Sequence, residues 1–153
     1  MIRYLTLFLF IGLFSCSRKI KKEDVFIIPE DYLGTVLVIY DVPKSTPANY
    51  DSVGRRLFII PKNGILETTF KATYNNSTMP KFYIINTKFE KVELDYVHND
   101  WDNIKYKDNI VVSTLETGKN KKDFLSFIIG PYNNDTIGNN RHKNRLEYFN
   151  KFK

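Results

Sequence analysis

Residues 25–40 read VFIIPEDYLGTVLVIY, and this segment indicates the fold class of the chain. It contains two apolar runs, residues 25–29 and 35–40, which are rich in β-branched and aromatic side chains. Pro29 ends the first run and Gly34 precedes the second. Runs of this composition, bounded by proline and glycine, are typical of β-strands. The segment therefore predicts two strands, and the uninterrupted apolar character of the second predicts a buried one.

Similar runs continue along the chain and are separated by polar turns. Strands that recur every 8–12 residues or so favour a sandwich or barrel over a parallel α/β sheet. We expect an all-β antiparallel sandwich, immunoglobulin-like or related, with a short amphipathic C-terminal helix around Leu146, Phe149 and Phe152. The further predicted strands are residues 56–60, 65–70, 81–85, 91–97, 110–112 and 124–129, the last of them stopped by Gly130-Pro131.

Two hairpins are expected among these strands. Asn63-Gly64, between residues 56–60 and 65–70, is the strongest hairpin signal in the chain, because both residues tolerate positive φ. The second hairpin joins residues 81–85 to 91–97. Clean apolar and polar alternation in residues 91–97 predicts one solvated face.

Two motifs within residues 26–70 resemble a known domain family. Residues 28–34 fit an Ile-Pro-Glu-x-Tyr-x-Gly pattern, and residues 60–66 fit an Ile-Pro-x-x-Gly-Ile-Leu pattern. Together they resemble a domain of unknown function in small secreted or lipid-anchored bacterial proteins. In this sequence, Asp31 stands where that pattern leads us to expect a glycine. The resemblance implies no activity, and the prolines, glycines and Tyr32 are interpreted as architectural.

The N-terminal residues follow the pattern of a lipoprotein signal peptide. Arg3 supplies the positive start, residues 4–14 are mostly apolar, and Leu13-Phe14-Ser15-Cys16 resembles the lipobox of bacterial lipoproteins. Eleven residues are too few to cross a hydrocarbon core, which takes about 20 in a helix. We therefore expect a signal peptide at 1–15, a lipidated Cys16 with a polar tether at 16–24, and a β-rich domain at 25–153. The expected location is the cell envelope, with a lipid anchor in a membrane, most readily the outer membrane.

Composition excludes several classes of protein. The chain has 153 residues, 42% of them apolar and 26% charged, which suits one globular domain and neither general disorder nor multiple membrane spans. Cys16 is the only cysteine, so no intramolecular disulfide can form. Lys and Arg exceed Asp and Glu by six, but no basic strip is interleaved with exposed aromatics, so nucleic acid is not an expected partner.

Few residues point to chemistry. No phosphate loop, His-Glu-x-x-His motif, cysteine pair or Gly-x-Ser-x-Gly elbow is present. His98, Asp100 and Asp102, with Asp95 nearby, are weak candidates for a metal or catalytic site. A solvated turn explains them equally well. We expect no cofactor and a non-enzymatic module that binds protein or glycan; the alternative is a hydrolase or metal-dependent accessory enzyme that uses these residues.

Labelling with palmitate tests the predicted lipidation of Cys16. Labelled palmitate should enter the wild-type protein and not the Cys16→Ser variant, because the thiol of Cys16 is the acceptor and the signal for processing. Labelling is read by autoradiography of the immunoprecipitated chain. Equal labelling of the two forms would contradict lipidation at Cys16.

Overall fold

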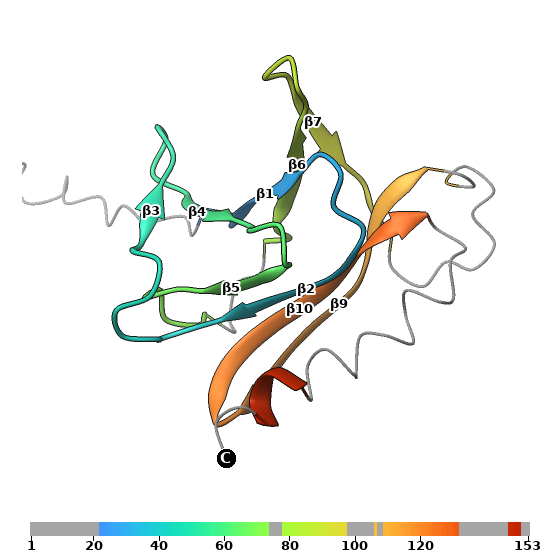
Figure 1. Cartoon of the computed structure of the whole chain (residues 1–153). Coiled ribbons are helices and arrows are strands. Elements are labelled where there is room, and N and C mark those ends of the chain that lie inside the picture. Colours follow the sequence, from blue (N-terminus) through green and yellow to red (C-terminus); the bar gives the residue numbers. More distant parts are fainter. Residues whose placement is uncertain (1–21, 74–77, 98–105, 107–108, 132–146, 151–153) are drawn as a thin grey trace, which may run out of the picture.

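The computed structural model describes residues 22–73, 78–97, 106, 109–131 and 147–150. In this part of the chain, ten strands form two five-stranded sheets that pack face to face as a sandwich (Figure 1). The strand order is β3-β4-β1-β6-β7 in the first sheet and β5-β2-β10-β9-β8 in the second. Residues 147–150 are helical. The β-rich, sandwich-like class predicted from sequence is confirmed.

The strands agree with most of the predicted ones. The first sheet contains β1 (Val25–Pro29), β3 (Asn49–Tyr50), β4 (Arg56–Ile59), β6 (Lys81–Ile85) and β7 (Lys91–Leu94). The second contains β2 (Gly34–Ile39), β5 (Ile65–Glu67), β8 (Tyr96–Val97), β9 (Ile110–Asn120) and β10 (Lys122–Pro131). The last two are longer than predicted, and β10 runs through Gly130 to Pro131 instead of stopping before them.

A row of phenylalanines forms the centre of the core. Phe58, Phe26 and Phe82 occupy matching positions on the adjacent parallel strands β4, β1 and β6. The ring of Phe26 stacks on Phe58 at 4.7 Å and on Phe82 at 5.4 Å between centroids. Phe127, from β10 of the other sheet, packs edge-on against Phe26 at 5.3 Å and against Phe82 at 5.0 Å. All four side chains are almost completely buried, so they join the two sheets.

The tetrapeptide Phe-Ile-Ile-Pro occurs twice, at residues 26–29 and 58–61. The two copies lie side by side, with Phe26 opposite Phe58 and Ile27 opposite Ile59. After each proline a short turn takes the chain into the second sheet, where β2 and β5 are again parallel neighbours. The repeat thus produces two equivalent strand–turn–strand units, one beside the other.

The prediction of purely antiparallel, immunoglobulin-like sheets is wrong, because both sheets are mixed. β1 is parallel to β4 and to β6, β2 is parallel to β5, and β8 is parallel to β9. The cause is that the chain crosses between the sheets. After β1 the chain passes to β2 in the second sheet, and it can then return to the first sheet with β4 running in the same direction as β1. Immunoglobulin sheets, in contrast, are antiparallel.

The predicted hairpin at Asn63-Gly64 is also wrong, although a turn is present. The Gly64 amide donates to the Pro61 carbonyl at 2.9 Å, and Gly64 has a φ of 74°. The turn joins β4 of the first sheet to β5 of the second, so the two strands do not pair. Turn residues fix the local chain reversal, whereas the partner of each strand is fixed by the apolar faces that it must bury.

Tyr32 fills the space beside this turn. Its hydroxyl donates to the Thr35 carbonyl and lies where a Cβ on Gly64 would be. The Tyr32 amide donates to the Pro29 carbonyl at 3.1 Å, which closes the turn between β1 and β2. The two motifs that carry the family resemblance therefore meet in space, and their tyrosine and glycine are complementary in shape.

The second predicted hairpin is confirmed, since β6 and β7 are antiparallel with Phe82 opposite Leu94. However, the single strand expected at residues 91–97 is divided. β7 ends at Leu94 in the first sheet, and β8 begins at Tyr96 in the second. Lys91 and Glu93 of β7 are exposed as predicted, but the alternation fails at Val92, which shares a face with the buried Leu94 and is exposed as well.

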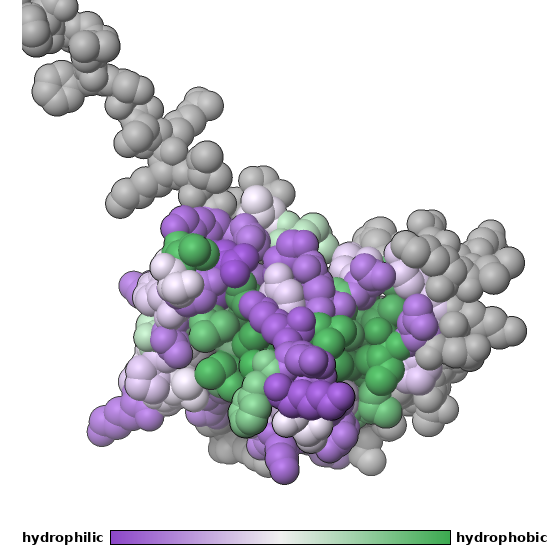
Figure 2. All heavy atoms as spheres, turned by 90° about the horizontal axis from the view of Figure 1, so that it is seen from above, coloured by the Kyte–Doolittle hydropathy of each residue, from purple (hydrophilic) through white to green (hydrophobic). Residues whose placement is uncertain are grey.

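The outer faces of the two sheets differ. Tyr148 and Phe149, from the helical residues 147–150, pack on Leu37, Ile39 and Phe124 of the second sheet. The predicted C-terminal helix is confirmed for these four residues, while Leu146 and Phe152 lie outside the described part of the chain. On the first sheet, Ile59 is 56% exposed and Ile85 is 39% exposed. Figure 2, which looks down from above the view of Figure 1, shows apolar side chains in two groups on that side, separated by polar ones.

Two glycine variants test the fit of Tyr32 against the turn. Gly64→Val should destabilise the protein by about 2–4 kcal/mol, of which about 1 comes from positive φ and the remainder from overpacking. A Cβ at Gly64 would lie 2.6 Å from Tyr32 Cζ and 2.8 Å from the Thr35 carbonyl oxygen. Gly54 is the control, because its φ is 76° and its Cβ would meet only Lys22 Nζ at 3.4 Å. Urea unfolding should show a clearly smaller loss for Gly54→Val, and equal losses would contradict the close packing.

Candidate functional site

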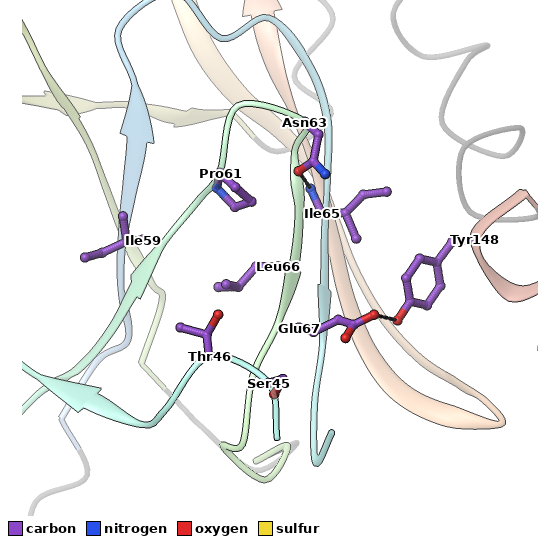
Figure 3. Close-up of a pocket in the computed structure, with 9 residues that line it drawn as sticks. All are labelled: Ser45, Thr46, Ile59, Pro61, Asn63, Ile65, Leu66, Glu67 and Tyr148. Atoms are coloured by element: carbon purple, nitrogen blue, oxygen red, sulfur yellow. Dashed lines mark hydrogen bonds between the residues drawn. The ribbon is translucent and has the colours of Figure 1, made fainter. Parts of the chain in front are cut away.

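A groove of about 570 Å³ surrounds the free edge of β5, at the side of the sandwich where β4 and β5 lie. Figure 3 shows Leu66 directed to one side of this strand and Ile65 and Glu67 to the other. The groove is thus formed by both faces of an edge strand, together with the turn that precedes it and the loop beside it. Its lining residues are Ser45, Thr46, Ile59, Pro61, Asn63, Ile65, Leu66, Glu67 and Tyr148.

Among the described residues, the backbone of β5 pairs with β2 on one side, and the other side carries a single isolated parallel bridge, between Thr46 and Thr68, just after the end of the strand. Two hydrogen bonds show which edge of this strand faces β2. The Leu37 amide of β2 donates to the Gly64 carbonyl at 2.8 Å, and the Thr68 amide donates to the Ile39 carbonyl of β2 at 3.0 Å. Hydrogen-bonding direction alternates along a strand, so the amide and carbonyl groups of Ile65 and Glu67 face the groove. This arrangement is a short sheet edge open to an additional strand.

Three polar groups, from Asn63 and Thr46, reduce the open edge without covering it. The side chain of Asn63 accepts the Ile65 amide at 3.1 Å. The Thr46 amide donates to the Glu67 carbonyl at 3.3 Å, and the Thr46 carbonyl accepts the Thr69 amide at 3.1 Å. The Ile65 carbonyl and the Glu67 amide remain directed into the groove between these two points.

A carboxylate and a phenol form the polar wall. The Tyr148 hydroxyl donates to Glu67 Oε1 at 2.6 Å (Figure 3). Burial, and then the hydrogen bond to Glu67, raise the pKa of Tyr148, so this hydroxyl stays protonated at neutral pH. The Tyr148 ring packs edge-on against Phe149 at 5.2 Å, and Phe149 packs against Phe124 at 5.7 Å. The C-terminal helical residues thereby complete the groove from a distant point of the sequence.

A second cavity of about 350 Å³ continues the groove towards β3. It shares Thr46, Ile59 and Leu66 with the groove and is otherwise lined by residues 47–49, Leu57, Phe58 and Thr68. The combined depression is lined about equally by aliphatic and polar side chains, and Glu67 is the acidic one among them. Such a lining suits binding of a chain that has both apolar side chains and polar anchor points.

A third cavity, of about 130 Å³, contains the buried ion pair of Asp24 and Arg56. Arg56 Nε donates to Asp24 Oδ1 at 2.7 Å, and Nη2 donates to the other carboxylate oxygen. The guanidinium also bonds to the Lys71 carbonyl and to Thr73 Oγ1, both at 2.8 Å. It lies 5.4 Å from the centroids of Phe58 and Phe70. With four of its five N–H donors used within the fold, Arg56 is interpreted as a link between the starts of β1 and β4.

The residues that sequence analysis selected are not part of this groove. Cys16, His98, Asp100 and Asp102 lie outside the described part of the chain, and Asp95 is exposed between β7 and β8. Among the residues that are described, no group of three His, Cys, Asp or Glu side chains could hold a metal. No described helix has the length and hydropathy of a membrane span.

Sequence analysis did not select the groove residues. Glu67 and Tyr148 are 81 positions apart, and neither belongs to a recognised catalytic motif. The available signal was indirect: Glu67 directly follows the Ile-Pro-x-x-Gly-Ile-Leu motif, and Tyr148 lies in the predicted helix.

Comparisons with known proteins support the fold. The sequence profile of a family of unknown function, DUF6843, matches residues 20–127. A solved structure of a "putative lipoprotein" from Bacillus anthracis aligns with a TM-score of 0.53, over 84% of this chain and 94% of that one. The two are 14% identical, so the likeness concerns the fold alone. No curated protein matches the sequence. The family resemblance predicted from the two Ile-Pro motifs is confirmed, since both lie within the matched residues.

Alkaline unfolding tests the Tyr148–Glu67 wall. Burial raises the pKa of Tyr32 to about 12, and the pKa of Tyr148 is raised as well. The folded state therefore holds both phenol protons more tightly than the unfolded state does. Their contribution to the free energy of unfolding is complete below about pH 10 and is lost as the pH rises above it. Tyr148→Phe should lower the free energy of unfolding by about 1 kcal/mol at neutral pH, and the value for the variant should fall less steeply with rising pH than that of the wild type. Urea unfolding from about pH 8 to 11 should show the difference between the two free energies becoming smaller, and a constant difference would contradict the burial of the Tyr148 hydroxyl.

Proposed function

The chain belongs to the DUF6843 family. We propose that it is a lipid-anchored protein of the bacterial cell envelope whose groove binds an extended segment of a partner protein. The family has no known function, so the proposal rests on the groove and on the N-terminal sequence. The proposal has two parts, the lipid-anchored location and the ligand of the groove, and each has its own support.

The lipid-anchored location is supported by the Leu13-Phe14-Ser15-Cys16 tetrad, which ends a short apolar stretch. The structural neighbour described as a lipoprotein is consistent with it, because it shares the fold. Two or more acyl chains on Cys16 would hold the protein stably, since each buried methylene contributes about 0.8 kcal/mol. The domain would then work outside the cytoplasm, next to the membrane that anchors it.

The single observation that carries the ligand proposal is the free edge of β5 inside a groove of about 570 Å³. An extended peptide can add to such an edge as a new strand, with backbone hydrogen bonds for affinity and side-chain pockets for specificity. Here the Ile65 carbonyl and the Glu67 amide would bond to the peptide backbone. Ile59, Pro61 and Leu66 would contact its apolar side chains on one side of the strand.

The lining favours a peptide over a glycan. Sugars are commonly held against the open faces of aromatic rings, whereas Tyr148 has only 7% of its surface exposed. The other exposed or half-buried side chains of the groove are mainly aliphatic or small and polar. Glu67 adds a negative charge beside the edge, which favours a ligand with lysine or arginine at the corresponding position.

Selection from a random decapeptide display library tests the ligand class. We expect the full mature chain to enrich peptides with alternating apolar residues and a basic residue. Binding of a selected peptide should be lost in Ile59→Asp and weakened in Glu67→Gln. Ile85→Asp is the matched control, because Ile85 is also an exposed isoleucine on the outer face of the first sheet and does not line the groove.

Fluorescence anisotropy with the labelled synthetic peptide measures the affinities. Equal binding by wild type and Ile59→Asp would refute the groove as the site. Binding of oligosaccharides on a glycan array that is lost in Ile59→Asp would keep the site and replace the peptide with a sugar.

A further inference from the structure

The residues that follow the tether are fixed to one end of the domain. The Arg55 Nη1 atom lies 2.9 Å from Glu23 Oε1, and Lys22 Nζ donates to the Val53 carbonyl. Asp24 is buried in its ion pair with Arg56, and its carbonyl accepts the Lys81 amide at 2.8 Å. The chain therefore enters the domain at a defined place, where the parallel strands β1, β4 and β6 all begin.

This end, defined by Lys22, residues 51–55 and residues 78–81, has a mixed surface. Val53 is 55% exposed and Met79 is 52% exposed. Lys22 and the neighbouring Lys71 are exposed cations. Arg56 is paired with one carboxylate and Arg55 with two, so the two lysines, the two arginines and these three carboxylates together carry a net charge of +1. Exposed apolar side chains beside lysines are the combination that lipid headgroups and the acyl boundary accommodate.

The length of the preceding segment restricts where this end can lie. Five residues, 17–21, separate Cys16 from Lys22. Fully extended, they bridge at most about 20 Å between the two Cα atoms. A lipid on Cys16 would therefore keep the Val53 and Met79 surface close to the headgroups. The other end of the same strands, with the β6–β7 turn and its 90% exposed Phe89, would be remote from them.

We propose that the end formed by Lys22, Val53 and Met79 is a membrane-docking surface that rests on the lipid headgroups of the anchoring membrane and so orients the domain. This inference rests on the lipid anchor of the proposed function. Two apolar side chains and two lysines bind a membrane weakly by themselves, but the anchor supplies a high effective concentration. The groove stays accessible in this orientation, because the turn at residues 61–64 follows β4 at the strand end away from the tether.

Paramagnetic relaxation in nanodiscs tests the orientation. The mature chain, residues 16–153, is coupled through the Cys16 thiol to a maleimide lipid in discs of phosphatidylcholine and phosphatidylglycerol, with a trace of gadolinium-chelating lipid. Relaxation enhancement of backbone amides should be strong at Val53 and Met79 and about tenfold or more weaker at Phe89, since the effect falls steeply with distance from the surface. Chemical coupling makes this result independent of cellular lipidation, which palmitate labelling decides separately.

Surface variants separate docking from simple tethering. Val53→Asp with Met79→Asp should lower the relaxation enhancement at residues 53 and 79 several-fold, because the tether alone then allows this end to lie up to about 20 Å from the headgroups. Phe89→Asp is the control and should leave the profile unchanged. A profile that is flat or reversed in the wild type, or one that survives the double substitution, would overturn the docking surface. Both substituted side chains are more than half exposed, so folding should be retained.

Discussion

The stack of Phe58, Phe26 and Phe82 is the interaction on which the rest of the structure depends. Each aromatic pair contributes about 0.5–1.5 kcal/mol beyond the burial of its surface. The larger effect is geometric, because rings can stack across three parallel strands only when those strands are in register. Phe127 then packs against the same row from the opposite sheet. Register within one sheet and contact between the two sheets thus have a common origin.

That register explains why β4 and β5 separate and leave a groove. The two Phe-Ile-Ile-Pro segments lie side by side, and each is followed by a turn into the second sheet. The second unit comes to lie towards the edge of both sheets, and among the described strands its further neighbour in the first sheet is the two-residue β3. Its turn is shaped by Tyr32 of the first unit against Gly64. The edge strand and its open side are therefore direct consequences of placing one such unit beside the other.

The same arrangement divides the molecule into regions with different roles. The chain enters where β1, β4 and β6 begin, and the ion pairs of Glu23 and Asp24 hold it there. The groove lies along β5, and its outer wall is the helical segment with Tyr148. A lipid anchor at one end and a peptide groove at the side form a consistent description of an envelope protein that captures partners close to a membrane.

The sequence by itself determined most of the strands, the buried character of β2, the helical residues near the C-terminus and the family. Apolar runs, turn residues and helical spacing are local patterns, and burial of each element follows from its own side chains. The sequence did not determine that Asn63-Gly64 would join two sheets, or that residues 91–97 would divide at Asp95 between them. Nor did it indicate that Glu67 would meet Tyr148. These outcomes depend on which strands become neighbours, and that choice is made by the joint packing of side chains from distant parts of the chain, such as Phe26, Phe58, Phe82 and Phe127. A local pattern carries no information about the direction of a partner strand, so only the tertiary structure decided the mixed sheets and the groove between their edges.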